Sequence, residues 1–283
     1  MWNAIYLVSI IVGISAQNIV KKPYTDKTNG RAVYWFNTIY SFAAILFFVA
    51  TSSSLDFNKA LVPYAIGFAV TYMMASVFSV KAISCGPLSL TALFISYSLL
   101  IPTFYGLIWL KDPIGKGFVP GILLLVISLF LINKKSEECI ISIRWILYVL
   151  LAVVGNGMCT IFQKMQQVAM SGNYKNEFMI VSLGIVAVSM FSLVLFREPR
   201  EGKVFVQGGC HWAIVCGLMN GMVNLFVMIL SKRMPVSLMF PLISSGGIIV
   251  TAAVARLIYK EKMTRMQFVG FVTGIASVIF LNI

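Results

Sequence analysis

The sequence predicts an all-α polytopic membrane protein with ten transmembrane helices built from two five-helix repeats. The first observation is composition: 59% of the 283 residues are hydrophobic and only 11% are charged, with a mean hydropathy of +0.92. The second is a series of apolar runs of about 17 to 25 residues, which is the length that crosses a bilayer. The third is similarity between the two halves of the chain. Water-soluble domains do not combine these features.

Ten apolar runs account for the ten predicted helices. The hydrophilic stretches 25–31, 134–144 and 197–207 are short connectors, and none could fold alone. The first run has no basic residue before it and no clear small-residue cleavage site, so we interpret it as a helix and not as a signal peptide. The runs cover 2–20, 33–50, 61–80, 88–110, 115–132, 145–168, 178–196, 212–230, 236–259 and 268–283.

The internal similarity places equivalent residues at constant offsets. Leu-Lys-Asp at 110–112, with a glycine at 121, returns as Tyr-Lys-Glu at 259–261, with a glycine at 270. Both copies stand between one apolar run and the next. We therefore divide the single membrane domain into a first repeat at 1–135 and a second at 144–283. An upstream set also recurs, with Tyr6, Val12, Gly13, Ile19 and Lys22 matched by Tyr148, Val154, Gly155, Ile161 and Lys164.

The net charge of +13 comes from basic residues that cluster at helix ends. There they set orientation and contact lipid headgroups, so nucleic acid is not expected as a partner. The loops after the odd-numbered helices share one side of the membrane and carry fifteen of the 22 Lys and Arg residues, against seven opposite. By the positive-inside rule this side faces the cytoplasm and both termini face out.

All nine acidic residues fall in loops or at helix ends. A site for a bare organic cation usually needs a buried acid as counter-ion, so we rank proton antiport of a cation low. Asp112 and Glu261 occupy equivalent positions just after the fourth and ninth helices, each beside a lysine. We expect them to cap neighbouring helix N-termini or pair with those lysines, and not to carry protons.

Amide side chains form a polar stripe within the apolar spans. Asn156, Thr160 and Gln163 lie at i, i+4 and i+7 of the sixth helix, and Asn220 and Asn224 lie one turn apart in the eighth. Single hydroxyl groups commonly bond neighbouring helices and no more. Several amides on facing repeats are more than helix-to-helix bonding requires, so we favour the interpretation that they line a solvated cavity.

The candidate substrate site combines these amides with aromatic walls from the opposite repeat, near the membrane midplane. Lys164 has two interpretations: it snorkels to the interface, or it presents its ammonium to a substrate carboxylate. Five cysteines without a CxxC pair and a single histidine, His211, predict neither a metal site nor a cofactor. The candidates are Gln17, Tyr72, Tyr97, Asn156, Thr160, Gln163, Lys164, Asn220, Asn224 and Ser244.

The chain resembles the EamA-like ten-helix members of the drug/metabolite transporter superfamily. The resemblance implies two inverted five-helix repeats around a central cavity formed by helices 1, 3, 4, 6, 8 and 9, with helices 5 and 10 at the periphery. It also implies cytoplasmic termini, opposite to the charge count. Asp112 stands where the family often has Glu, and Thr251 replaces a mid-helix proline. The residues that carry the resemblance are Pro87, Ser89, Pro102, Asp112 and Gly121, then Pro235, Ser237, Glu261, Gln267 and Gly270.

These observations together predict a secondary transporter in the bacterial cytoplasmic membrane. We expect an exporter of a small polar or amphipathic metabolite, such as an amino acid, that works by alternating access. No GxxxxGK[ST] motif is present, so a gradient or the substrate itself must supply the energy. A non-transporting scaffold protein and a transporter of an organic cation or drug are the alternatives. An enzyme is disfavoured, because one histidine and no intramembrane acid leave few acid-base groups. The expected partners are a small-molecule substrate and membrane lipid, with a homodimer left open.

Overall fold

The computed structural model describes residues 2–52, 55–85, 91, 94–95, 97–112, 115–132, 142–257 and 265–281, and this part of the chain is helical. Two 3-10 turns, η1 (Lys59–Leu61) and η2 (Tyr97–Leu99), precede α3 and α5. The α-helices are α1 (Trp2–Thr28), α2 (Val33–Ala50), α3 (Val62–Cys85), α5 (Leu100–Ile108), α6 (Phe118–Ile132), α7 (Ile143–Ala169), α8 (Lys175–Arg197), α9 (Gly202–Arg233), α10 (Val236–Leu257) and α11 (Arg265–Leu281).

The all-helical membrane fold predicted from the sequence is confirmed. Among the described residues, five helical segments are long and apolar enough to cross a membrane: Val33–Ala50, Lys59–Ala82, Ile143–Ala169, Lys175–Arg197 and Gly202–Arg233. Shorter apolar segments lie in α1, α6 and α11. The chain is therefore a multi-pass membrane protein by length and composition of its helices.

Two predicted boundaries differ from the structure by eight residues or more. α1 continues to Thr28, through Pro23 and beyond the predicted end at 20. α9 begins at Gly202, inside the predicted connector 197–207, and contains a kink at Gly209 (φ 98, ψ 86). Glycine adopts this left-handed conformation without a steric penalty, so the chain bends there and then enters the predicted span. The predicted fourth helix at 88–110 contains α5, while 86–90, 92–93 and 96 lie outside the described residues.

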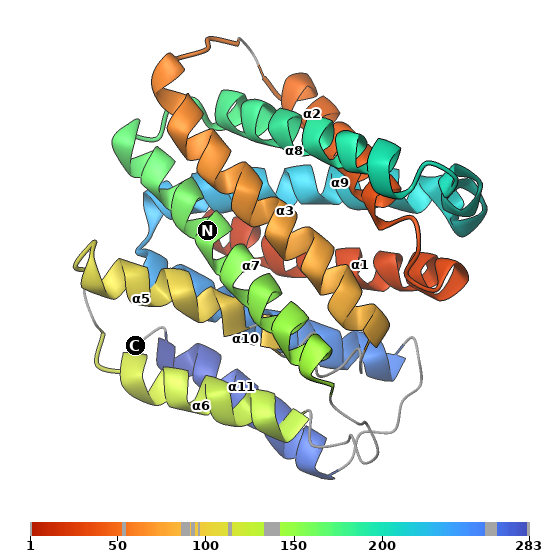
Figure 1. Cartoon of the computed structure of the whole chain (residues 1–283). Helices are drawn as coiled ribbons and strands as arrows, with labels where there is room; N and C mark the ends of the chain where they lie inside the picture. Colours follow the sequence, from red (N-terminus) through yellow and green to blue (C-terminus); the bar gives the residue numbers. More distant parts are fainter. Residues whose placement is uncertain are drawn as a thin grey trace.

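The helices pack as pairs that join the two halves of the chain. In Figure 1, α3 and α7 run side by side across the near face, α8 lies beside α2 at the top, and α6 lies beside α11 at the bottom. Behind them α9 packs against both α1 and α2. Phe48, Phe68, Phe178 and Met179 form a fully buried core cluster between these helices. Helices from both halves therefore enclose the centre of the molecule.

Small residues allow the closest helix contacts. A Cβ atom on Gly155 of α7 would lie 2.7 Å from the backbone nitrogen of Ala75 and 2.8 Å from the carbonyl oxygen of Thr71, so only glycine fits. In the α6–α11 pair, Ser128 donates to the carbonyl of Gly270 (2.6 Å) and Ser277 donates to that of Gly121 (2.8 Å). Such small-residue contacts are the usual way in which membrane helices approach one another.

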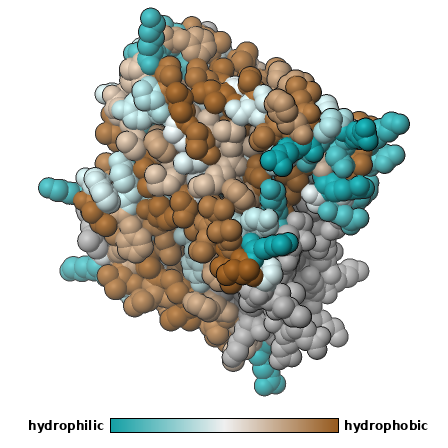
Figure 2. All heavy atoms as spheres, in the orientation of Figure 1, coloured by the Kyte–Doolittle hydropathy of each residue, from teal (hydrophilic) through white to brown (hydrophobic). Residues whose placement is uncertain are grey.

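Apolar side chains cover the outside of the bundle. Figure 2 shows hydrophobic residues across much of the near face, with hydrophilic residues gathered at its margins. Trp109, Phe196 and Val188 are 71%, 82% and 70% exposed, which is unfavourable in water and favourable in lipid. The polar groups discussed next lie on the inside.

Candidate functional site

Amide side chains of α7 and α9 are hydrogen-bonded to one another in the interior. The Nε2 group of Gln163 donates to Oδ1 of Asn224 (2.6 Å). Asn224 in turn donates through Nδ2 to Oδ1 of Asn220 (2.9 Å). Asn220 and Asn224 lie one turn apart on the face of α9 that meets α7, so helical periodicity alone aligns them.

The same chain of contacts continues into the first half of the protein. Nδ2 of Asn220 donates to the hydroxyl of Tyr72 on α3 (3.2 Å). Tyr72 packs against the buried cluster that contains Tyr40 of α2, and the Tyr40 hydroxyl donates to Oε1 of Gln17 on α1 (3.1 Å). We call this set the polar chain: Gln163, Asn224, Asn220, Tyr72, Tyr40 and Gln17.

The polar chain consists of neutral groups, four of them buried and two, Tyr72 and Asn224, half-buried. Gln163, Asn220 and Gln17 are 3%, 6% and 6% exposed. A buried amide is costly unless its hydrogen bonds are made, and each amide of the polar chain makes at least one side-chain hydrogen bond. Amides and phenols both donate and accept, so they can exchange these bonds for bonds to another neutral or zwitterionic molecule.

Five predicted site residues meet in the polar chain: Gln17, Tyr72, Gln163, Asn220 and Asn224. Sequence reasoning missed Tyr40 as a sixth member. The signal that could have identified it is a tyrosine in the middle of an otherwise apolar span, because a buried phenol needs a hydrogen-bond partner.

The other five candidates lie elsewhere. Nδ2 of Asn156 donates to the Ser98 hydroxyl of η2 (2.6 Å), and Thr160 donates to the carbonyl of Gly157 in its own helix (2.7 Å). The half-buried Lys164 donates through Nζ to the carbonyl of Ser231, which ties α7 to α9 (2.6 Å). The hydroxyls of Tyr97 and Ser244 are buried and have no hydrogen-bond partner among the described residues.

Carboxylates act at helix ends. Oδ2 of Asp112 accepts a hydrogen bond from the backbone nitrogen of Ser237 at the start of α10 (3.0 Å). The prediction that Asp112 caps a neighbouring helix is therefore confirmed. Its repeat equivalent, Glu261, lies outside the described residues.

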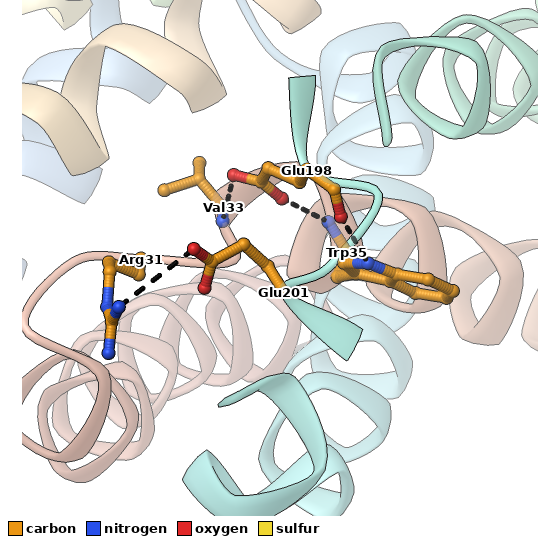
Figure 3. A network of polar contacts seen from close by, with 5 residues as sticks. All are labelled: Arg31, Val33, Trp35, Glu198 and Glu201. Carbon is orange, nitrogen blue, oxygen red and sulfur yellow. Dashed lines mark hydrogen bonds and ion pairs between the residues drawn. The ribbon is translucent and has the colours of Figure 1, made fainter. Parts of the chain in front are cut away.

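Glu198, at the end of α8, is a second such carboxylate, and sequence reasoning missed it. Figure 3 shows its contacts with Val33 and Trp35: Oε1 accepts from the backbone nitrogen of Val33 (2.9 Å), and Oε2 accepts from that of Trp35 (3.3 Å). Oε2 also accepts from the backbone nitrogen of Tyr34 (3.0 Å). These three N–H groups begin α2, whose own N-cap residue, Ala32, supplies no side-chain cap. No local motif marks the contact, because its partners are 165 to 163 positions apart in sequence.

Burial and hydrogen bonding act in opposite directions on the Glu198 carboxyl. Burial raises its pKa, the three backbone N–H groups lower it, and the nearby Glu201 raises it again, with a net upward direction. The Arg31 guanidinium approaches Glu201 at 4.0 Å and is 62% exposed. The charge of Glu198 is thus held by backbone dipoles (Figure 3).

Two other features of the described residues lie outside the polar chain. A surface hollow of about 330 Å³ at the start of α9 is lined by Gly202, Lys203, Val206 and Gln207. Within the part of the chain that the structure describes, no three His, Cys, Asp or Glu side chains are grouped as a metal site.

Comparison with known proteins adds two findings. The model of the EamA-like transporter family matches residues 143–283. A solved crystal structure matches with a TM-score of 0.77 at 11% identity, covering 98% of this chain and 95% of the other. A likeness at this identity shows the fold alone. No curated protein sequence matches the chain.

Proposed function

Because the chain belongs to the EamA-like transporter family through residues 143–283, we propose that it is a secondary transporter of a small polar or amphipathic metabolite, such as an amino acid. Transport proceeds by alternating access, in which one repeat moves against the other and a gradient supplies the energy. We take export as the expected direction of transport.

The polar chain is the observation that carries this proposal. Neutral hydrogen bonds join α7 to α9 and α9 to α3 across the two halves, and α2 to α1 within the first half. A substrate with its own donors and acceptors can replace these bonds one for one. The helices can then separate without leaving amides unpaired, which would cost about 1–3 kcal/mol per group.

The pairing of helices supports two inverted repeats as the moving parts. The first helix of each half, α1 or α7, packs against the third helix of the other half, α9 or α3. The α6–α11 pair is reciprocal in detail, because Ser128 and Ser277 each bond the glycine carbonyl of the other helix. Both features are expected from a two-fold relation between the repeats.

The neutral polar chain also favours one substrate class. None of its six members carries a charge, so a neutral or zwitterionic molecule suits it better than an unaccompanied organic cation. Lys164 follows Gln163 in α7, and its ammonium, which donates to the carbonyl of Ser231, would favour the carboxylate end of a zwitterion. A scaffold protein would instead keep the polar chain closed at all times.

We place the protein in the bacterial cytoplasmic membrane, surrounded by lipid. A cysteine introduced near Asp56, exposed between α2 and η1, decides its orientation. The charge count predicts that an impermeant thiol reagent labels this cysteine in intact cells. Protection of the same cysteine would support cytoplasmic termini, as the resemblance implies.

The test of function is efflux from proteoliposomes. Purified protein is reconstituted into vesicles loaded with a mixture of amino acids, nucleosides, sugars and quaternary amines, and the external medium is measured by mass spectrometry. We expect at least one neutral or zwitterionic compound to leave faster than from protein-free vesicles. Equal efflux of every compound would contradict the proposal, and selective efflux of the amines would favour a cation transporter.

A further inference from the structure

The extension of α1 beyond its predicted end brings Lys21 into the bundle. The first apolar run ends at residue 20, but α1 continues to Thr28, so Lys21 belongs to the helix and not to a connector. Its side chain is half-buried, and Nζ lies over the ring of Tyr40 in α2, 5.5 Å from the ring centroid. The negative face of an aromatic ring attracts such a cation. The ammonium of Lys21 is therefore directed toward α2.

Tyr40 places this ammonium within the depth of the membrane. It lies seven residues after Val33, the first residue of α2, which at 1.5 Å per residue is about 10 Å along the helix. Its side chain is buried in a cluster with Phe36 and with Cys216 of α9. A charged group at such a depth is costly, and in membrane proteins it usually marks the path of a substrate or an ion.

The surroundings of Lys21 belong to the polar chain. Gln17 lies four residues earlier on α1, so the side chains of Gln17 and Lys21 share one face of the helix. The Tyr40 hydroxyl donates to Oε1 of Gln17 (3.1 Å). Sγ of Cys216 donates to the backbone carbonyl of Gln17 (3.8 Å), so α9 packs against the same turn. Lys21 thus adds a cation to the end of the polar chain that Tyr40 and Gln17 form.

The internal repeat indicates the same position. The offset of 142 residues that aligns the starts of the two halves pairs Lys22 with Lys164, and it therefore pairs Lys21 with Gln163. Gln163 is the member of the polar chain that donates to Asn224 of α9. The equivalent positions of α1 and α7 both contribute to the same interior, one with an ammonium and the other with a neutral amide.

Lys164, the other lysine beside the polar chain, is directed away from it. Its Nζ donates to the carbonyl of Ser231 (2.6 Å). Ser231 lies seven residues beyond Asn224, about 10 Å along α9, and the helix ends at Arg233. The ammonium of Lys164 is therefore held near a helix end, whereas that of Lys21 lies against a member of the polar chain.

A single ammonium beside neutral donors suits a carboxylate. A carboxylate carries one negative charge and accepts hydrogen bonds from ammonium, amide and phenol groups, which Lys21, Gln17 and Tyr40 supply. A phosphate monoester carries a charge of about −1.5 to −2 at pH 7, so it would require a second cation.

We propose that Lys21 is a specificity-determining residue, whose ammonium binds the carboxylate of the transported molecule at the end of the polar chain formed by Tyr40 and Gln17. The inference rests on the proposed transport function and narrows its substrate class to molecules that carry a carboxylate, zwitterionic amino acids among them. Binding is measured without transport, so the two proposals fail separately.

Matched acids and amides provide the test. The pairs are leucine with leucinamide, phenylalanine with phenylalaninamide, glycine with glycinamide, and benzoate with benzamide. The shift in the unfolding midpoint of the protein in detergent gives an apparent Kd for each compound. Efflux of the same compounds from proteoliposomes is measured against protein-free vesicles. For at least one pair we expect the acid to bind more tightly than the amide and to leave the vesicles faster.

Four variants separate the charge of Lys21 from other effects. Lys21→Gln introduces the side chain that the second half carries at 163, and it should reduce the preference for the acid about tenfold or more. Lys21→Arg keeps the charge and the preference. Lys27→Gln removes an exposed lysine of the same helix and changes neither binding nor efflux. Lys164→Gln keeps the preference for the acid, whatever its rate of efflux.

Three results would overturn the proposal: no acid binds the unsubstituted protein more tightly than its amide, folded Lys21→Gln keeps the full preference, or Lys164→Gln loses it instead. If Lys21→Gln does not fold, Lys21→Met removes the same charge and is judged in the same way. A preference for acids that depends on Lys21, without efflux of any compound, would retain the carboxylate site and remove the transport function. Efflux without a preference for acids would do the reverse.

Discussion

The centre of the bundle and the end at Glu198 use opposite kinds of polar contact. In the centre, neutral amides and phenols such as Gln163 and Asn220 bond to one another across helices. At the end, one carboxylate holds the backbone of another helix. Neutral side chains can exchange partners at low cost in a medium without water. A carboxyl group bound by several N–H groups ties two helices at several points at once, and what it contributes depends on its protonation.

This difference separates two tasks. Groups that must release one another to admit a substrate are neutral, and groups that hold helices in register are charged and lie near the membrane surface. Asp112 follows the second pattern, because it caps α10 from the end of the α5 segment. The following predictions test this distinction between neutral contacts in the centre and charged contacts at helix ends.

The largest loss of stability is expected in the centre. Gln163→Leu removes the donor to Asn224 and leaves a buried amide oxygen with no partner, which should lower the free energy of unfolding by about 1–3 kcal/mol. Denaturant unfolding in detergent measures it. Thr160→Val, one turn earlier, removes only a bond within its own helix and serves as the control. Equal losses in the two variants would mean that the amide contact contributes nothing specific.

The next effect concerns the end of α2. Glu198→Ala removes the cap from three backbone N–H groups and should cost about 1–2 kcal/mol. At the opposite end of the α2–α8 pair, Nδ2 of Asn176 donates to the Ser52 hydroxyl (2.8 Å), so Asn176→Ala removes one neutral bond and should cost about 0.5–1 kcal/mol. Hydrogen exchange at residues 33–35 would show whether the loss is local. Unchanged protection of these amides in Glu198→Ala would contradict the role assigned to the carboxylate.

The pH dependence of stability gives a signed prediction. Burial raises the pKa of Glu198 in the folded protein above its ordinary value of about 4.3. The stability that this group contributes is fully present below that ordinary value and is lost as pH rises through the folded pKa. The unfolding midpoint of the unsubstituted protein should therefore fall with rising pH relative to Glu198→Gln. A difference that grows in the opposite direction would mean that the three N–H groups outweigh burial.

The smallest effect is expected at the neighbouring ion pair. Arg31 reaches Glu201 at 4.0 Å and is mostly exposed, so Arg31→Gln should change the free energy of unfolding by less than about 0.5 kcal/mol. The same unfolding experiment measures it. A loss as large as that of Glu198→Ala would mean that the ion pair, and not the cap on α2, holds α8 to the start of α2.

The positions of the helices were predictable from the apolar runs, and the alignment of the internal amides was predictable from their helical spacing. The amides of α9 and Gln163 of α7 follow helical spacing, so their alignment needed no tertiary information. The kink at Gly209 was not predictable, since a glycine between a polar connector and an apolar run has no single conformation. The extension of α1 to Thr28 was not predictable either, because it passes through Pro23, a residue type that usually ends or kinks a helix. The Glu198 contact depends on how α2 and α8 pack, and residues so far apart in sequence give no local signal.

The central claim is that substrate passes by way of the polar chain, and Asn220 tests it most directly. Its amide bonds both Tyr72 and Asn224, so Asn220→Leu breaks the chain between the two halves. The efflux rate of the compound identified with the unsubstituted protein is measured in proteoliposomes containing Asn220→Leu or Thr160→Val. We predict that Asn220→Leu falls to the rate of protein-free vesicles while remaining folded, and that Thr160→Val transports normally. Normal efflux through folded Asn220→Leu would contradict the account.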